Sequence, residues 1–458
     1  TTANTHQFFG IAAYNLAIDC MADDLIMQSQ GNGWFWGDHC YNVKSNYTSS
    51  AFRSYDVWYA NYKWIANVNY IIDAEPEMAG TEADVAYVAG QAYAIRALCY
   101  LNLATWFSRA PYNSLTGASR WNEPCVPVYT TGTSIDTGGQ PRESLRTVYG
   151  RIDQDIDRAI ELLEKARETT LAENNKSHIN LYVALGIKSR ACLAEGDWDG
   201  AFKAAKRVID EGGYAVGTKS DLTGGMNSLD KQNVMWGAGI QVADQAGGYA
   251  GFFTHMDNKE GAYAKSAPKL ISKQLYNRIS ATDIRRDWWD PSDKESPYVS
   301  KKFSFANVAS FLGDYIYMRV EEMYFTAAEA ALRLDDLKSA RELMNTVMAE
   351  RDPGYSANNR SGTLLGATTT TWTGSFLENI LTHRRIELWG EYGRLFDVRR
   401  LGQGIDRRTD DGFSEECISM MNRRNVNITK ADTYDWVLTI PKAELDANPN
   451  INEEDQNP

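Results

Sequence analysis

Acidic, basic and imidazole side chains alternate through residues 380–402 at spacings that suit acid–base chemistry. Glu387 and Glu391 are four residues apart, as are His383 and Glu387, so each pair would share one face of a helix. A zinc-protease helix requires HExxH, and the second histidine is missing here. Arginines crowd both glutamates and would hold the carboxylates ionised. We therefore favour a structural helix over an acid/base pair.

We expect residues 376–402 to form one such helix. Its apolar stripe contains Ile386, Trp389 and Gly393, widened by Leu388, Leu395 and Phe396. Opposite charges three residues apart predict that the ionic groups pair among themselves, as Glu391–Arg394, Arg394–Asp397 and Asp397–Arg400. Gly402, or Gly404 after it, would end the helix.

Other catalytic signatures are missing from the sequence. It contains no GxSxG motif, no Walker loop and no GxGxxG after a strand. Its five histidines, at positions 6, 39, 178, 255 and 383, lie too far apart for a zinc motif. We expect a protein that is not an enzyme and has no cofactor. A weak structural-calcium signal remains at Asp290 and Asp293 and at Asp410–Asp411, neither of which matches an EF-hand.

Aromatic residues in glycine-, aspartate- and proline-rich segments indicate a binding surface instead. A flat ring can lie against the apolar face of a sugar while polar neighbours take its hydroxyl groups. The candidate ligand-binding rings are Trp34, Trp36, Tyr249, Phe252, Phe253, Trp288 and Trp289. Their candidate polar partners are Asp38, Asn42, Asp244, Gln245, Asp287 and Asp290. For any single ring, the alternative is that it fixes its loop to the scaffold.

The segment Gly31–Asn42 allows a more specific hypothesis. Glycines at 31, 33 and 37 flank its rings. If the segment is extended, Trp34 and Trp36 lie on one side as a platform, and Phe35 lies on the other as an anchor. By contrast, five tryptophans follow helical periods and are expected in the core: Trp58, Trp64, Trp106, Trp198 and Trp389.

Composition narrows the class of ligand. The 458 residues are 43% hydrophobic and 23% charged, which is typical of a globular chain with a large core. The net charge of −13 argues against nucleic acid. No run of 18 apolar residues occurs, and the chain opens without a signal-peptide pattern, so we expect any targeting segment to be absent or removed. The six cysteines are expected to be buried free thiols, although Cys20 and Cys40 could pair.

Helical periodicity dominates the chain. It predicts helices at 6–30, 50–74, 82–107 and 142–163, and a helix pair at 178–212. Residues 191–212 align without a gap with residues 330–351, in the helix–turn–helix pattern of tetratricopeptide repeats. Ala201 and Ala340 match in this alignment and should lie where helices cross closely. Between the two copies, residues 216–312 form a loop-rich insertion that contains a strand-like run at 233–242.

Several motifs also resemble the SusD/RagB family. RRIELWGEYGRLFDVRRLG, at 384–402, resembles the family's signature helix, with a departure at Tyr392–Gly393. The ending IPKAELDANPNINEEDQNP, at 440–458, resembles the family's closing motif. Arg96–Leu103, the run 125–130 and Arg142–Leu163 resemble further family segments, so the similarity extends along the whole chain.

The resemblance implies a predominantly all-α fold, a tetratricopeptide-like right-handed helical superhelix with large irregular loop insertions. We expect an N-terminal half (1–215) and a C-terminal half (216–458) in one compact unit. The second half would hold the insertion, a helix pair at 313–351, the signature helix and an extended tail. Since the family commonly uses a tryptophan in its early loop, Trp34 or Trp36 is expected to meet ligand.

The implied function is non-catalytic capture of an oligosaccharide at the bacterial cell surface. The protein would be an outer-membrane lipoprotein that delivers its ligand to a SusC-like TonB-dependent transporter. It would touch the membrane only through an N-terminal lipid anchor that this chain does not contain, and it would not bind nucleic acid. The alternatives are a peptide-binding RagB-like member of the family and a helical-repeat scaffold that binds another protein.

Overall fold

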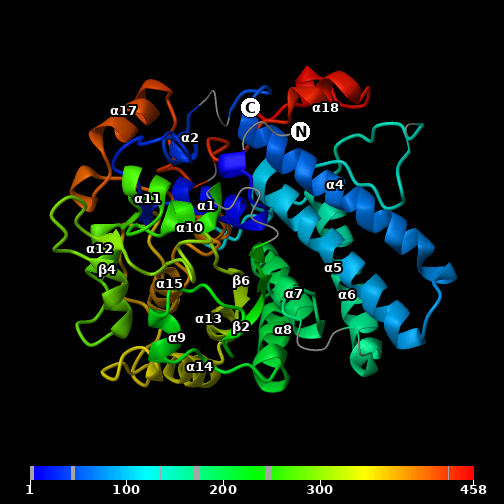
Figure 1. Ribbon diagram of the computed structural model, residues 1–458. Coiled ribbons are helices and arrows are strands. Elements are labelled where there is room, and N and C mark those ends of the chain that lie inside the picture. Colours follow the sequence, from blue (N-terminus) through cyan, green and yellow to red (C-terminus); the bar gives the residue numbers. More distant parts are fainter. Residues whose placement is uncertain are drawn as a thin grey trace.

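The computed structural model describes residues 5–42, 47–134, 136–169, 171, 175–242, 250–431 and 433–458. Long helices stack along one side of the molecule, and shorter elements and loops fill the other side (Figure 1). The stack consists of α4 (Phe52–Ala74), α5 (Glu82–Phe107), α6 (Leu145–Lys165), α7 (Leu181–Glu195), α8 (Trp198–Glu211), α13 (Val320–Arg333) and α14 (Leu337–Ala349). These bounds confirm the helices predicted from periodicity between residues 50 and 212.

Side chains placed at the helix starts explain where the scaffold helices begin. Thr81 accepts a hydrogen bond from the Asp84 N–H at the start of α5, at 3.1 Å. Ser144 does the same for the Thr147 N–H of α6, at 3.2 Å. Each cap satisfies a backbone donor that has no partner within the helix.

The repeat predicted at 191–212 and 330–351 is confirmed. Asp197 and Asp336 cap α8 and α14 in the same way, each at 3.0 Å from the backbone N–H three residues later. Ala201 and Ala340 are both fully buried. Helix α8 also packs against α13, so the chain leaves the stack after α8 and returns to it at α13. The division into halves at residue 215 stays a prediction.

The insertion carries short strands and helices. The run at 233–242 contains β2 (Val234–Ala238), which pairs antiparallel with β6 (Tyr315–Arg319). A second sheet has the order β1 (Leu25–Ile26), β3 (Leu270–Ile271), β5 (Val299–Ser300), β4 (Trp289–Asp290). The short helices here are α9 (Lys219–Thr223), α10 (Phe252–Met256), α11 (Ala262–Ser266), α12 (Lys273–Tyr276) and η5 (Ile284–Trp288).

Two predicted helices are interrupted. The helix predicted over 6–30 is α1 (Ile11–Met21), preceded by η1 (Thr5–Gln7) and followed by β1. The helix predicted over 376–402 is two helices, α15 (Phe376–Glu387) and α16 (Arg394–Leu401). Between them, Gly390 (φ 72°) and Gly393 (φ 104°) take left-handed conformations that end one helix and start the next. Gly402, at φ 74°, ends α16 as predicted.

The remaining elements are α2 (Trp36–His39), η2 (Glu75–Glu77), η3 (Ala166–Glu168), η6 (Thr409–Asp411), α17 (Glu415–Arg423), α18 (Lys442–Ala447) and η7 (Glu453–Asp455). The six cysteines are free and buried, so the suggested Cys20–Cys40 pair does not form. Within the described ranges, no helix combines the length and apolar character needed to cross a membrane.

Candidate functional site

The carboxylates of the segment 380–402 are structural. Glu387 is fully buried and accepts hydrogen bonds from Arg285 (3.1 Å), Arg319 (2.9 Å) and Arg351 (3.0 Å). Burial alone would raise the pKa of Glu387, but these three guanidinium groups outweigh it and hold the pKa well below its usual range. Glu391 is likewise held by Arg319, at 2.7 Å. Neither group is poised to exchange protons with a substrate.

The pairing within this segment differs from the prediction. Asp397–Arg400 is confirmed at 2.7 Å. Arg394 pairs with Asp23 of the first segment, at 2.7 Å, and not with Glu391 or Asp397. The glycine break separates Glu391 from Arg394. Asp397 follows the break, as Arg394 does, but it is held by Arg384 and Arg400.

Most of the predicted ligand-binding rings are not accessible. The prediction that they are exposed is wrong for five that are buried in the core: Trp36, Phe252, Phe253, Trp288 and Trp289. Each of them lies within a short helix or strand, which its glycine-, aspartate- or proline-rich context did not indicate. Tyr249, together with Asp244 and Gln245, lies outside the described residues.

The loop at 31–42 is not extended, so the proposed two-tryptophan platform is wrong. Phe35 takes a left-handed conformation (φ 61°), and α2 starts directly after it, which turns Trp36 inward. Phe35 is fully buried, as expected of an anchor. Trp34 is only partly buried and stacks on His6, with ring centroids 4.5 Å apart. Trp34 therefore stays a candidate for ligand contact.

Two of the predicted polar partners, Asp38 and Asp290, are engaged in contacts within the fold. Asp38 is buried and forms an ion pair with Arg53 at 2.9 Å. Asp290 accepts a hydrogen bond from the Ser292 N–H at 3.0 Å, and Asp293 does so from Glu295. Among the described residues, no three His, Cys, Asp or Glu side chains are placed to hold a metal ion, so the calcium suggestion gains no support.

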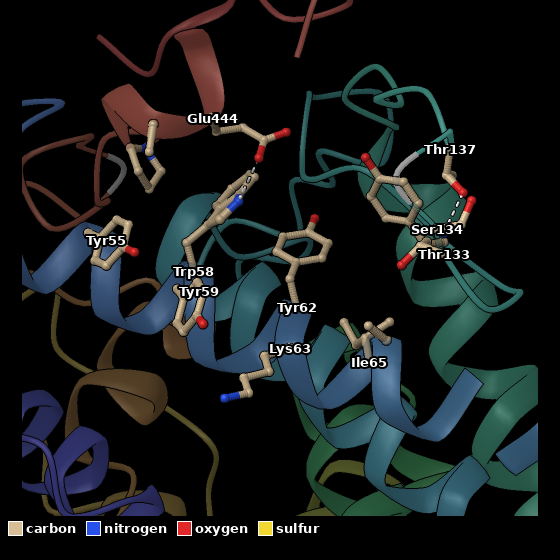
Figure 2. Close-up of a pocket in the computed structure, with 14 residues that line it drawn as sticks. Tyr55, Trp58, Tyr59, Tyr62, Lys63, Ile65, Thr133, Ser134, Thr137 and Glu444 are labelled. Atoms are coloured by element: carbon tan, nitrogen blue, oxygen red, sulfur yellow. Dashed lines mark hydrogen bonds between the residues drawn. The ribbon is translucent and has the colours of Figure 1, made fainter. Parts of the chain in front are cut away.

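The structure reveals a different aromatic site, a groove of about 540 Å³ along α4 (Figure 2). We call it the α4 groove. Helix α4 forms its floor, and two segments distant in sequence form its walls. The lining residues are Tyr55, Trp58, Tyr59, Tyr62, Lys63, Ile65 and Ala66 of α4, Tyr129, Thr133, Ser134 and Thr137 of the loop before α6, and Pro441, Ala443 and Glu444 of the tail.

Helical spacing places the rings of the groove side by side. Tyr55 and Tyr59 are one turn apart, each 40% exposed, and their rings are nearly parallel with centroids 5.6 Å apart. Trp58 lies between them and the core, tilted against Tyr62 at 4.9 Å. The floor is therefore a continuous aromatic surface that offers both ring faces and hydroxyl groups.

The loop wall is fixed by polar side chains of the scaffold. Asn69 donates to the carbonyl of Thr131 at 2.9 Å, and Arg96 donates to that of Thr130 at the same distance. Arg96 is itself held by Asp155 in a two-point ion pair. Burial raises the pKa of the Tyr129 hydroxyl, which accepts from the Gln140 N–H and keeps its own proton for donation.

The tail wall depends on Glu444. One carboxylate oxygen of Glu444 accepts a hydrogen bond from the Trp58 indole N–H at 3.2 Å (Figure 2). The other accepts from the Asn448 amide at 2.7 Å. Asn448 also donates to the Gln140 carbonyl at 2.8 Å, so the tail and the loop hold each other in place.

Sequence reasoning missed this groove. Trp58 is buried, as predicted, but its edge also lines the groove. A signal was present in the spacing of Tyr55, Tyr59 and Tyr62, which form a second, aromatic stripe beside the core-facing one. The walls gave no signal because tertiary contacts alone bring them to α4.

Comparison with known proteins shows which proteins this chain resembles. A profile of the SusD family matches residues 260–458, and a profile described as starch-binding associating with outer membrane matches residues 12–193. The chain belongs to the SusD family. No curated protein sequence shows significant similarity to it.

Solved structures of SusD-like proteins agree along the whole chain. A SusD-like carbohydrate-binding protein from Bacteroides vulgatus is 24% identical, with a TM-score of 0.77 over 99% of this chain and 94% of that one. A SusD superfamily protein from Bacteroides thetaiotaomicron is 23% identical, with a TM-score of 0.78 over 100% and 96%. Surface glycan-binding protein A from Bacteroides uniformis is 18% identical, with a TM-score of 0.67 over 96% and 93%. These similarities confirm the tetratricopeptide-like SusD fold for this SusD-family chain.

Proposed function

We propose that this protein captures an oligosaccharide at the bacterial outer membrane without cleaving it. The α4 groove is the observation that carries this proposal. Its rings can stack on the apolar faces of sugars, and its tyrosine, serine and threonine hydroxyls can bond to sugar hydroxyls. Relatives of the same fold are described as carbohydrate-binding and glycan-binding proteins.

The groove suits a glycan better than the alternative peptide ligand. A peptide that binds as an added strand needs the exposed edge of a sheet for its backbone hydrogen bonds. The floor of the α4 groove is a helix and its walls are a loop and the tail with its short helix, and none of the described lining residues lies in a strand. The aromatic floor can instead contact successive sugar rings along the helix.

We further propose that the protein is a surface-exposed lipoprotein that delivers its ligand to a SusC-like TonB-dependent transporter. The family description, which associates starch binding with the outer membrane, supports this location. Buried ion pairs explain why the carboxylates of 380–402 would take no part in hydrolysis.

Isothermal titration with a panel of oligosaccharides and peptides tests the proposal. We expect saturable binding to a glycan, no binding to peptides, and no shorter products after long incubation. Peptide binding alone would favour the RagB-like alternative. Shorter products that persist after repurification would show that the protein is an enzyme.

A further inference from the structure

Glu444 places a fixed negative charge on the wall of the α4 groove. Hydrogen bonds from Trp58 and Asn448 hold its carboxylate, one to each oxygen. Each carboxylate oxygen can accept two hydrogen bonds, so acceptor capacity remains for a ligand. Hydroxyl groups that donate to a carboxylate form stronger hydrogen bonds than those that donate to a neutral acceptor.

Among the described residues, Glu444 has no ion-pair partner within 4 Å, and Lys442 of the same helix pairs with Asp446 at 2.7 Å. Lys63 is the one cation among the described residues that line the groove. Figure 2 shows its amine directed away from Glu444, and it lies 5.8 Å from the ring centre of Tyr59.

Sites that bind acidic sugars need the opposite arrangement. Carboxylate and sulfate groups are held best by arginine, whose planar group donates two parallel hydrogen bonds. No arginine is among the described residues that line the groove. The net charge of −13 adds a background field of the same sign as Glu444.

We infer that the groove selects uncharged glycans and that Glu444 determines this selectivity. The inference rests on the proposed function and names its substrate class. Glu444 would attract neutral sugars through their hydroxyl groups and repel uronic acids or sulfated sugars by like charge. Specificity of this kind comes from a repulsive element as well as an attractive one.

Matched ligands test the inference directly. Each neutral oligosaccharide in a panel is compared with the same oligosaccharide oxidised at C6 to the uronate, by isothermal titration at low and moderate salt. For any neutral glycan that binds, we expect the oxidised form to bind at least about tenfold more weakly. Salt should narrow this difference because it screens the repulsion.

The variant Glu444→Gln should move the two affinities in opposite directions. Binding of the neutral glycan should weaken, since an amide is a poorer acceptor than a carboxylate. Binding of the oxidised glycan should become tighter, since the repulsion is gone. Asp446→Asn is the matched control. It removes the same charge from α18 at a residue outside the groove, and the selectivity should not change.

The outcomes distinguish the inferred selectivity from the proposed capture of a glycan. Equal or tighter binding of the oxidised form to the wild-type protein would overturn the selectivity while leaving glycan capture intact, whether or not the Glu444→Gln protein folds. A loss of selectivity in Asp446→Asn equal to that in Glu444→Gln would overturn the role of Glu444. If neither form of any glycan binds, the proposed function fails and the inference fails with it.

Discussion

At the scale of single residues, the strongest electrostatic feature is the carboxylate of Glu387, which three buried arginines share. Burying four charged groups costs free energy that only complete pairing offsets. The arginines also pair with Asp283, Glu321 and Glu391. Glu387 is the carboxylate that all three of them contact, so losing it leaves part of their buried positive charge unbalanced.

Replacing Glu387 with glutamine should lower the free energy of unfolding by at least about 3 kcal/mol, since it removes the shared counter-charge of Arg285, Arg319 and Arg351. Urea denaturation measures this. Glu161→Gln is the control, because Glu161 is exposed and pairs only with exposed partners, and it should leave the midpoint unchanged. Equal midpoints for both variants would contradict the structural role of Glu387.

The buried carboxyl group of Asp19 should make the stability of the protein depend on pH. Burial raises the pKa of Asp19 to about 8, although the Arg394 N–H donates to one oxygen. The folded state therefore keeps a proton that the unfolded state loses above about pH 4. Stability from this group falls as pH rises from about 4 to 8, by up to about 1.4 kcal/mol for each pH unit.

Asp19→Asn should remove this dependence while keeping the acceptor oxygen. Urea midpoints of both proteins, measured at several values between pH 5 and 8, test it. We expect the wild-type protein to lose stability relative to Asp19→Asn as pH rises. A constant difference across this range would show that folding does not raise the pKa of Asp19.

The ionised state of Glu387 and Glu391 was predictable from neighbouring arginines, but the actual partners were not. Arg285, Arg319 and Arg351 lie 102, 68 and 36 residues from Glu387 in the chain. Local spacing identifies neighbours along a helix, and it correctly predicted the ion pair between Asp397 and Arg400. It carries no information on groups that only the tertiary fold brings together.

At the scale of elements, periodicity predicted the scaffold well and its interruptions poorly. Helices α4 and α5 match their predicted ranges within two residues because an apolar period marks each of them, and Thr81 also caps the start of α5. The segment 376–402 keeps a helical period across a break because Gly390 and Gly393 do not disturb the pattern of hydrophobic residues. Gly390 lies against Met256 and Phe303 of the insertion, whereas the space around Gly393 is open.

Alanine substitutions test that break. Gly393→Ala should lower the free energy of unfolding by about 1–2 kcal/mol, because its φ is strained for other residues but space is open. Gly390→Ala should cost more, since its Cβ would lie 2.8 Å from Met256 and Phe303. Gly150→Ala, in open space on α6, should instead stabilise by about 0.5–1 kcal/mol. Stabilisation by Gly393→Ala would mean that the helix is continuous.

At the scale of the whole molecule, the α4 groove exists because three segments distant in sequence converge, which are 55–66, 129–134 with Thr137, and 441–444. The closing motif, recognised from sequence as a family feature, supplies a wall and the carboxylate of Glu444. Spacing alone showed the tyrosine stripe, but not that it faces a groove. Aspartate- and proline-rich contexts suggested exposure for Trp288 and Trp289, which tertiary contacts bury.

The effect of the groove tyrosines on glycan affinity tests most directly whether the α4 groove binds the glycan. Isothermal titration with a glycan that binds the wild-type protein is compared for Tyr55→Ala/Tyr59→Ala, Trp34→Ala and Phe311→Ala, with thermal melts of each. Phe311 is an exposed ring outside the groove.

Burying one ring against a sugar is worth about 1.5–3 kcal/mol of binding free energy, so the double variant should lose at least about tenfold in affinity with little change in stability. Phe311→Ala should bind normally. Normal binding by the double variant, with loss of binding in Trp34→Ala, would contradict the account and place the ligand at the Trp34 loop.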